Sequence, residues 1–304
     1  MQKKILIIGK GSSAKNHKKA LKMLNKNLLV ESVSSRTLDS AFGKSYKKLT
    51  KLNPDYFIIC SPSTYHYKHF KVIEKFFKKK IVLIEKPLFD KTVKIKKKPN
   101  NRYFVGYNLR LHPVLIFVKK YLKNKKIFSI RASCSSYLPD WRRQASYRKS
   151  VSGNKKLGGG VLLELSHELD YLTWIFGKIK LLNVFNKKVS NLKIDTDDIL
   201  NLSATTSKKS LITLNINFFS KIVSRELIID GNNFSLFGDL TKNKITLYEG
   251  NKKKVFSFKN FKLFQTYKLE NYNMINKRFK NLCSLNEGLR LVNLLSQIRK
   301  KTRS

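Results

Sequence analysis

The sequence predicts an α/β protein: an N-terminal Rossmann-type, doubly wound parallel sheet, followed by an α+β domain with a largely antiparallel open sheet. Three observations predict this fold. Short apolar runs alternate with helical stretches over residues 4–120, a glycine-rich loop separates the first strand from the first helix, and segments of alternating apolar and polar residues follow. Buried parallel strands give continuous apolar runs, whereas strands with one exposed face give alternation. We therefore expect a first domain over residues 1–120 and a second over residues 121–304.

The first domain contains the runs KILIIG, DYFIIC and KIVLIE, which are typical of parallel strands buried on both faces. Apolar residues at helical spacing separate these runs. In chain order we expect a strand at Lys4–Ile8, a helix near Ala14–Leu24, strands at Leu29–Val33 and Tyr56–Cys60, a helix near Tyr67–Phe77, and strands at Ile81–Ile84 and Tyr103–Tyr107.

The second domain has longer segments in which apolar and polar residues alternate, as in antiparallel strands with one buried face. We expect strands at Ile127–Ser133, Ile199–Thr205, Ser210–Phe219, Glu226–Asp230, Ser235–Phe237, Lys244–Tyr248 and Lys254–Phe258. A single helix is predicted at Glu164–Phe176. The repeat of apolar residues every three positions predicts a closing amphipathic helix at Glu287–Lys300.

The composition is that of a globular protein, with 304 residues of which 41% are hydrophobic. No stretch has the 18 or so apolar residues of a membrane span, and the apolar run Ile5–Ile8 is too short for a signal peptide. Cys60, Cys134 and Cys283 form no CxxC pair, which argues against a disulfide framework or a structural zinc site. We expect a cytoplasmic protein.

The net charge of +45 would suit a nucleic acid or an anionic membrane surface. However, the chain has 52 lysines and only 12 arginines, and the lysines are spread along its whole length. Proteins that read nucleic acids use arginine heavily for bidentate contacts. We therefore expect a solvated lysine surface without a specific nucleic-acid or membrane partner, and keep polyanion binding as a remote alternative.

The glycine-rich loop Gly9-Lys10-Gly11-Ser12-Ser13-Ala14 fits the pattern GxGxxA between a strand and a helix. The first glycine allows the tight turn, the second lets the backbone approach a pyrophosphate, and Ala14 packs the helix closely on the strand. The start of the helix then offers N–H groups to phosphate. This context favours a dinucleotide site over an ordinary strand–helix turn.

The choice between NAD and NADP depends on the end of the second strand. There Ser35 and Arg36 offer a hydroxyl and a guanidinium to a 2′-phosphate, which favours NADP. Glu31 leaves NAD open, because its carboxylate would bond the ribose hydroxyl if the strand ended earlier.

Five segments occur in order along the chain: GKGSSAKNH (9–17), ICSPSTYH (59–66), LIEKPL (83–88), VGYNLRLHP (105–113) and LGGGVLLELSHELDYL (157–172). Together they resemble the Gfo/Idh/MocA family of NAD(P)-dependent sugar and cyclitol oxidoreductases. The resemblance implies hydride transfer between a carbinol carbon and nicotinamide, and an open second-domain sheet that often forms homo-oligomers. It also implies cofactor contacts by Cys60, Ser61, Pro62, His66, Glu85 and Lys86.

Glu85-Lys86-Pro87 matches the family's EKP motif, whose lysine contacts substrate and cofactor and assists proton transfer. A partly desolvated lysine beside an oxidised, cationic nicotinamide suits a general base. The alternative is one more surface lysine. Its place at the carboxyl end of an expected parallel strand, where ligands of α/β proteins bind, favours the functional interpretation.

Glu164, His167 and either Asp170 or Tyr171 follow the glycines at 158–160. Their spacings of three, and of three or four, would place them on one helix face. The resemblance implies that the histidine is an acid/base, and imidazole has a suitable intrinsic pKa. Many family members have an aspartate four positions before it, whereas Glu164 lies three before it. Which acid orients His167 therefore stays open, as does a purely structural histidine.

Arginines and aromatic residues gather around the expected domain boundary and predict a site for an acidic or nucleotide-linked sugar. The residues in question are Tyr107, Asn108, Arg110, Trp141, Arg142, Tyr147 and Arg148. The equally weighted alternative is arginines that pack on strands or pair with Asp140.

No metal is expected, because the segment starting at His167 begins like HExxH but has Tyr171 at the last position. The leading function is an NADP-preferring oxidoreductase of a sugar carbinol, in which Lys86 and His167 handle the proton. A non-redox enzyme that retains a nicotinamide and a non-catalytic cofactor sensor remain alternatives.

Overall fold

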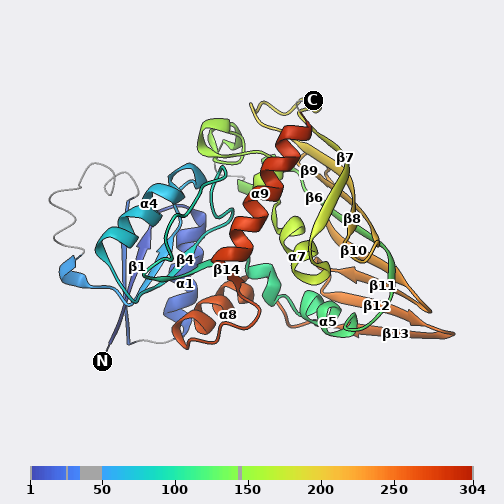
Figure 1. The fold of residues 1–304 in the computed structure, drawn as a ribbon, viewed down its shortest axis with the longest axis horizontal. Helices are drawn as coiled ribbons and strands as arrows, with labels where there is room; N and C mark the ends of the chain where they lie inside the picture. The colour runs from blue at the N-terminus through green and yellow to red at the C-terminus, as the bar shows by residue number, and fades with distance from the viewer. Residues whose placement is uncertain (1, 25–26, 35–49, 143–145, 303–304) are drawn as a thin grey trace. The chain divides into compact units, whose positions relative to one another are not determined.

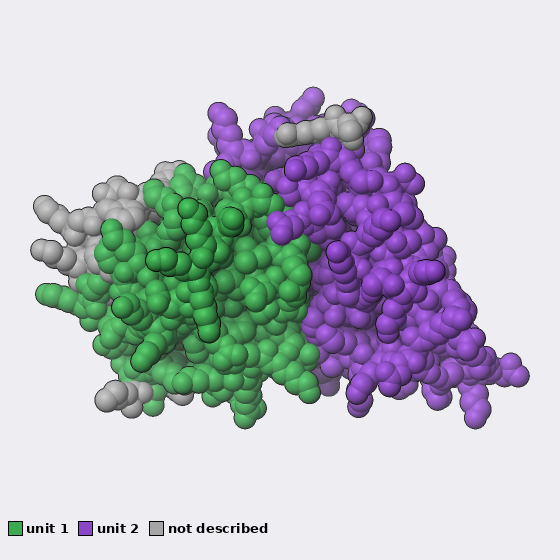
Figure 2. All heavy atoms as spheres, in the orientation of Figure 1, with its two compact units in different colours: residues 1–111, 262–292 green, residues 112–261, 293–304 purple. Residues whose placement is uncertain are grey.

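The computed structural model describes residues 2–24, 27–34, 50–142 and 146–302. These residues form two compact units (Figure 2). Unit 1 comprises residues 1–111 and 262–292, and unit 2 comprises residues 112–261 and 293–304. The sequence analysis expected a single boundary near residue 120. It did not predict that residues 262–292 pack with the first unit.

Unit 1 is built on a six-stranded sheet with the order β14-β5-β4-β3-β1-β2, in which every pair except β14–β5 is parallel. Its elements are β1 (Lys3–Ile8), α1 (Ser12–Leu24), β2 (Leu28–Val33), β3 (Tyr56–Ile59), α4 (Ser63–Phe76), β4 (Ile81–Ile84), β5 (Arg102–Val105), η1 (Asn108–Leu111), α8 (Phe264–Ile275), β14 (Cys283–Ser284) and the first part of α9 (Leu285–Lys301). The apolar runs of β1, β3 and β4 are buried, as continuous apolar strands require.

The C-terminal segment completes unit 1 from a distance of more than 150 residues along the chain. Its helix α8 lies beside α1 (Figure 1), and its strand β14 adds an antiparallel edge to β5. Met274 and Leu282 join the apolar core beneath the sheet, which also contains Ile5 and Ile58. Helix α8 was not predicted, because its apolar residues show almost no helical periodicity.

Unit 2 is built on an eight-stranded sheet with the order β13-β12-β11-β10-β6-β9-β8-β7. All its strand pairs are antiparallel except β6–β9. Its elements are α5 (Pro113–Tyr121), β6 (Ile127–Ser135), η2 (Leu138–Arg142), η3 (Tyr147–Lys149), η4 (Lys155–Leu157), α6 (Val161–Glu164), α7 (His167–Phe176), β7 (Ile179–Lys187), β8 (Ile199–Thr206), β9 (Leu211–Asn217), β10 (Ser224–Gly231), β11 (Phe234–Asp239), β12 (Lys244–Glu249), β13 (Lys252–Ser257) and the end of α9.

The predicted helix at Glu164–Phe176 is wrong in one respect, because two helices occupy this stretch. α6 ends at Glu164 and α7 begins at His167. Between them, the Ser166 hydroxyl donates a hydrogen bond to the Leu163 carbonyl at 2.8 Å. Such a side-chain bond competes with the helical backbone pattern and breaks the helix. Strand β7 and helix α5 were also not predicted.

No helix among the described residues has the length and apolarity to cross a membrane.

Candidate active site

The glycine-rich loop connects β1 to α1 and lies at the carboxyl edge of the parallel sheet. Gly9 has a φ of +130°, and a Cβ atom there would come within 2.5 Å of the Cys60 carbonyl oxygen. Its N–H donates to the Val33 carbonyl at 2.8 Å. Gly11 has open space where a Cβ would stand, as a backbone that must admit a pyrophosphate requires. Only glycine fits at position 9 of this turn. The loop leaves the start of α1 accessible to an anion.

The segments after β3 and β4 reach the same edge and are tied together by His66. The buried His66 ring faces the Ser61 carbonyl through Nε2 at 2.8 Å and the Pro87 carbonyl through Nδ1 at 2.9 Å. Burial lowers the pKa of His66 despite these backbone contacts. Of the cofactor residues implied by the resemblance, Ser61 and His66 are therefore buried supports of the two loops.

Lys86 lies two residues after the end of β4 and is half-buried. The next peptide bond, Lys86–Pro87, is cis. The Glu85 and Gly106 N–H groups bond the Ile59 and Ile84 carbonyls at 2.9 and 2.8 Å, which fixes the strand end before Lys86. The structure thus brings Lys86 to the same sheet edge as Gly9 and Cys60. Ser35 and Arg36, on which the NADP prediction depends, lie outside the described residues, whereas Glu31 is a half-buried residue of β2.

The predicted substrate residues that follow β5 are buried in unit 1. Tyr107 and Asn108 have exposed fractions of 2% and 6%. Arg110 is 2% exposed, and its Nη1 lies 2.7 Å from Glu287 Oε1 at the start of α9. Glu287 was not recognised from the sequence, where Asp140 was the suggested partner. The structural alternative therefore describes Arg110, whose guanidinium fastens α9 to unit 1.

In unit 2, the glycines at 158–160 bring the chain tightly around Asp197. Gly160 has a φ of +109°, and a Cβ there would lie 2.2 Å from Asp197 Oδ1. Asp197 accepts from the Val161 N–H through its carbonyl and from the Leu162 N–H through Oδ2, at 2.9 and 2.8 Å. It thereby caps α6, a role that the sequence analysis missed.

The three residues expected on one helix face are divided between α6 and α7. Glu164, at the end of α6, accepts from the Ser152 hydroxyl at 3.0 Å. His167 is half-buried at the start of α7, and Asp170 is buried one turn later. Glu168, which the sequence analysis passed over, is fully buried, and its Oε1 lies 2.8 Å from Arg225 Nε. The shared face deduced from helical spacing is thus corrected for Glu164, while His167 and Asp170 share α7.

The remaining predicted substrate residues lie in unit 2. The Trp141 indole donates to the Ser136 hydroxyl at 2.9 Å, and its ring packs edge-on against Phe218. Arg148 lines a cavity of about 580 Å³ together with Lys188 and Lys193. The Tyr147 hydroxyl accepts from the Lys193 N–H at 3.3 Å, and this bond, with Arg148, lowers the pKa of Tyr147. Arg142, the remaining one of the predicted substrate residues, is the final residue of η2.

Comparisons with protein families assign both parts of the chain. Residues 3–107 match the description "Oxidoreductase family, NAD-binding Rossmann fold", and residues 119–302 match "Oxidoreductase family, C-terminal alpha/beta domain". The chain belongs to the Gfo/Idh/MocA oxidoreductase family. The predicted fold class and the assignment as an oxidoreductase with an NAD-binding domain are thereby confirmed. No curated protein sequence matches the chain.

Solved structures of similar fold include several dehydrogenases of low sequence identity. A levoglucosan dehydrogenase in complex with NADH and levoglucosan is 14% identical, with a TM-score of 0.81 over 100% of this chain and 98% of that one. WlbA dehydrogenase from Bordetella pertussis, with NADH and UDP-GlcNAcA, is 18% identical, with a TM-score of 0.76 over 100% and 97%. UDP-N-acetylglucosamine 3-dehydrogenase GnnA from Acidithiobacillus ferrooxidans is 14% identical, with a TM-score of 0.75 over 98% and 97%.

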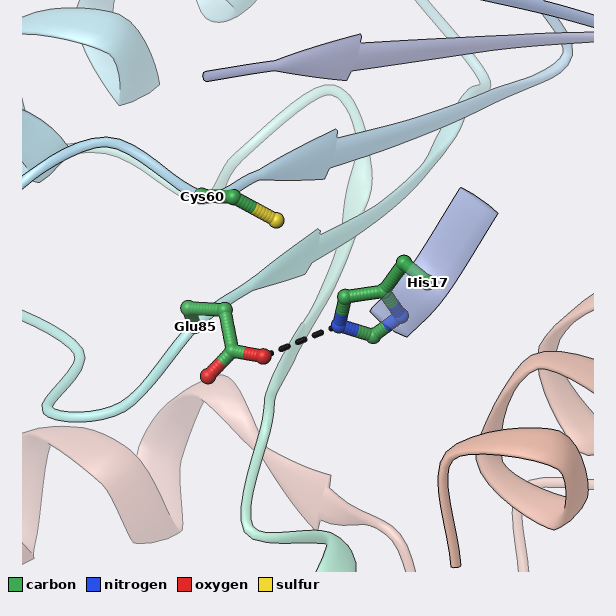
Figure 3. Close-up of side chains that lie close together, drawn as sticks. All are labelled: His17, Cys60 and Glu85. Carbon is green, nitrogen blue, oxygen red and sulfur yellow. Dashed lines mark hydrogen bonds and ion pairs between the residues drawn. The ribbon is translucent and has the colours of Figure 1, made fainter. Parts of the chain in front are cut away.

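Among the residues that the structure of this Gfo/Idh/MocA oxidoreductase describes, one group of side chains could offer ligands to a metal ion. His17, Cys60 and Glu85 offer donor atoms within 4.8 Å of one another (Figure 3). His17 Nε2 and Glu85 Oε1 are already joined at 2.9 Å. Burial and the neighbouring Glu85 charge raise the pKa of the Cys60 thiol, whereas metal binding needs the thiolate. The arrangement therefore suits a hydrogen-bonded cluster better than a metal centre.

Glu270 of α8 lies near this cluster and is 1% exposed. Its Oε2 has no hydrogen-bond partner among the residues that the structure describes. Burial and the charge of Glu85 raise the pKa of Glu270 well above its usual value. Because the folded protein then binds a proton that the unfolded chain releases, Glu270 makes stability fall as pH rises above about 4.3.

We expect Glu270→Gln to remove this pH dependence, since glutamine has similar volume and carries no proton to lose. The wild-type free energy of unfolding should fall by up to about 1.4 kcal/mol more per pH unit than that of the variant above about pH 4.3. Chemical denaturation followed by circular dichroism at several pH values measures this difference. Parallel curves for the two proteins would contradict a neutral, buried Glu270.

Proposed function

We propose that this oxidoreductase transfers a hydride between a nicotinamide cofactor and a carbinol or keto carbon of a sugar-type substrate. The observation that carries the proposal is that Gly9 and Lys86 follow the carboxyl ends of parallel strands β1 and β4, at one edge of the unit 1 sheet, where ligands of such sheets bind. Gly9 leaves no room for a side chain, and Gly11 leaves the loop open. When bound there, the nicotinamide accepts or donates the hydride.

The chain's own task is then to bind, orient and move one proton. We assign to Lys86 the uptake of the hydroxyl proton as the carbinol is oxidised, and its return in the reverse direction. His167 of unit 2 is proposed as the second acid/base, with Asp170 or Glu164 as its orienting acid. The fold likeness to dehydrogenases solved with levoglucosan or UDP-GlcNAcA supports a sugar as substrate.

The substrate proposal is narrower: an acidic or nucleotide-linked sugar. It is supported by the cavity in unit 2, which is lined by Arg148, Lys188 and Lys193 and by the carboxylate of Asp195. Lys188 also pairs with the buried Asp198 at 3.9 Å, which leaves Arg148 and Lys193 as the positive charges that face a ligand. Guanidinium and ammonium groups bind carboxylate and phosphate through charge-assisted hydrogen bonds. A substrate panel in which only neutral hexoses and cyclitols turn over would contradict this assignment.

For the cofactor we propose a preference for NADP over NAD, based on Ser35 and Arg36. In fluorescence titrations at physiological salt, which screens the bulk positive charge, NADPH should bind more tightly than NADH. Arg36→Ala should weaken NADPH binding about 10-fold or more, because a charge-assisted bond is lost, and should change NADH binding little. Glu31→Gln is the matched control. Equal losses of NADPH and NADH binding in Arg36→Ala would contradict the preference. So would an unchanged Arg36→Ala together with a Glu31→Gln variant that loses NADH binding.

Self-association through the outer face of the unit 2 sheet is the final part of the proposal. We define the outer face as residues of the five central strands, β11, β10, β6, β9 and β8, that point away from the core: Ser129, Arg131, Ser133, Asn201, Ser203, Thr205, Leu211, Thr213, Asn215, Glu226, Ile228, Asp230, Ser235 and Phe237. None of them is a lysine, although the chain has 52. Lysines occur on the same side only in the flanking strands, at Lys180, Lys187, Lys244 and Lys253. A central patch without lysine in so basic a protein favours contact with a second copy.

We expect the wild-type protein to be larger than a monomer in light scattering coupled to size-exclusion chromatography. Phe237→Lys places a charge on the β11 strand of the outer face and should shift the mass to that of a monomer. Met23→Lys, at an exposed residue of α1 in unit 1, should leave the mass unchanged. A monomeric wild-type protein, or an unaltered assembly of Phe237→Lys, would rule out this interface.

A further inference from the structure

A chain of buried polar side chains runs through unit 1 from α8 to the strand end that precedes Lys86. It joins Tyr56 to Asn271, Asn271 to His17, and His17 to Glu85. His17 and Asn271 have exposed fractions of 0%, and Glu85 of 7%. Figure 3 shows its last step, in which the His17 ring on α1 points at the Glu85 carboxylate.

The partners of Asn271 fix the orientation of its amide group. Its Nδ2 lies 2.8 Å from the Tyr267 carbonyl oxygen, which can only accept a hydrogen bond. Its Oδ1 accepts from the Tyr56 hydroxyl at 3.3 Å. The reversed amide would place two acceptor oxygens against each other. Asn271 therefore presents its second N–H to His17 Nδ1, at 2.8 Å.

This amide N–H in turn selects the tautomer of His17. Because Nδ1 accepts from Asn271, it holds no proton, and the imidazole proton stands on Nε2. Nε2 then donates to Glu85 Oε1 at 2.9 Å. The Asn271 N–H and the Glu85 carboxylate therefore both favour the tautomer that carries its proton on Nε2.

The carboxylate at the end of this chain is held in its ionised form. Burial alone would raise the pKa of Glu85, but the hydrogen bond from His17 and the charge and N–H of Lys86 hold that pKa below its usual value. Glu85 Oε2 accepts from the Lys86 backbone N–H at 3.2 Å. A Cβ at Gly106 would lie 3.2 Å from the same oxygen, so the glycine at this position leaves room for the carboxylate.

We propose that His17 and Asn271 are positioning residues for Lys86, acting through the tautomer-selected hydrogen bond that holds the Glu85 carboxylate against the Lys86 backbone. This inference rests on the proposed role of Lys86 in proton transfer. A small displacement of a reacting group can lower the rate by up to about 100-fold. The contact between His17 and Glu85, which acts on Lys86 through Glu85, should therefore have a measurable effect.

The first test is the tautomer itself, which needs no substrate. In a ¹⁵N-histidine-labelled sample the chain has only five histidines to assign. Long-range ¹H–¹⁵N correlations should show His17 with a protonated Nε2 and an unprotonated Nδ1 at neutral pH. A proton on Nδ1, or on both nitrogens, would overturn the inference whether or not the proposed function is right.

The second test separates positioning from packing by kinetics. His17→Leu removes the donor to Glu85 and should lower kcat about 10- to 100-fold with little change in cofactor affinity. His17→Gln keeps an N–H for Glu85 and should recover most of kcat. Thr266→Val, at a buried α8 residue whose hydroxyl bonds only the Leu263 carbonyl in the described contacts, is the control with unchanged kcat.

The outcomes distinguish this inference from the proposed function. Wild-type protein that turns over no sugar would contradict the proposed function, while the tautomer measurement still stands. Wild-type turnover with an unimpaired His17→Leu, or with a His17→Gln as poor as His17→Leu, would overturn the positioning role. If His17→Leu does not fold, Asn271→Ala removes the contact that orients the His17 ring toward Glu85, and we expect a lowered kcat. An unchanged kcat in that variant would contradict the inference equally.

Discussion

Replacing Lys86 with alanine should lower kcat about 100- to 10,000-fold, the usual contribution of a general acid or base. The half-buried amine follows β4 at the sheet edge shared with the glycine-rich loop, where it can accept the hydroxyl proton of a bound substrate. Alanine removes the amine without touching Gly9 or the start of α1. Cofactor affinity should therefore stay within a few-fold of the wild-type value, which fluorescence titration measures beside steady-state turnover.

Lys91→Ala is the matched control, because Lys91 is an exposed lysine five residues further along the same segment. It should leave kcat unchanged even though it removes the same charge. His167→Ala should also lower kcat while sparing cofactor binding. Unimpaired turnover in both Lys86→Ala and His167→Ala would remove the proton-handling proposal and favour the alternative of a cofactor sensor or a non-redox enzyme.

The features of unit 1 that the sequence predicted correctly depend on neighbouring residues. The apolar runs of β1, β3 and β4 reflect burial on both sheet faces, and the glycine pattern at 9–14 reflects a turn that only glycine fits. These patterns are local, so a single sequence contains them. The same holds for the alternation of the unit 2 strands.

The contacts that sequence analysis missed join residues far apart in the chain. Asn271 meets His17 across 254 positions, and Glu287 meets Arg110 across 177. Neither asparagine nor glutamate on an amphipathic or weakly periodic helix indicates such a partner. The division between α6 and α7 depends on one hydroxyl bond at Ser166, which helical spacing cannot reveal. Spacing arguments therefore placed Glu164 on the wrong helix.

Arg225→Met should destabilise unit 2 by about 3–5 kcal/mol, because it leaves the Glu168 carboxylate buried without its partner. Glu168 is fully buried, and Arg225 is 18% exposed at its side chain. The ion pair lies beside Cys134. Burial, as the larger cause, and the Glu168 charge raise the pKa of the Cys134 thiol to about 12. Both tryptophans, Trp141 and Trp174, belong to unit 2, so their fluorescence in a urea titration reports the unfolding of this unit.

The double variant Glu168→Leu/Arg225→Met separates the value of the ion pair from the cost of an unpaired charge. Replacing both members of a buried pair by apolar residues is often neutral, so its stability should return close to that of the wild-type protein. In Arg225→Met alone, burial should raise the pKa of the unpaired Glu168 carboxyl above its value in the unfolded chain. The carboxyl should therefore be protonated in the folded state. Stability should then fall as pH rises above about 4.3, by up to about 1.4 kcal/mol per unit. A single variant as stable as the wild-type protein, with no such pH dependence, would show that the pair is solvated in solution.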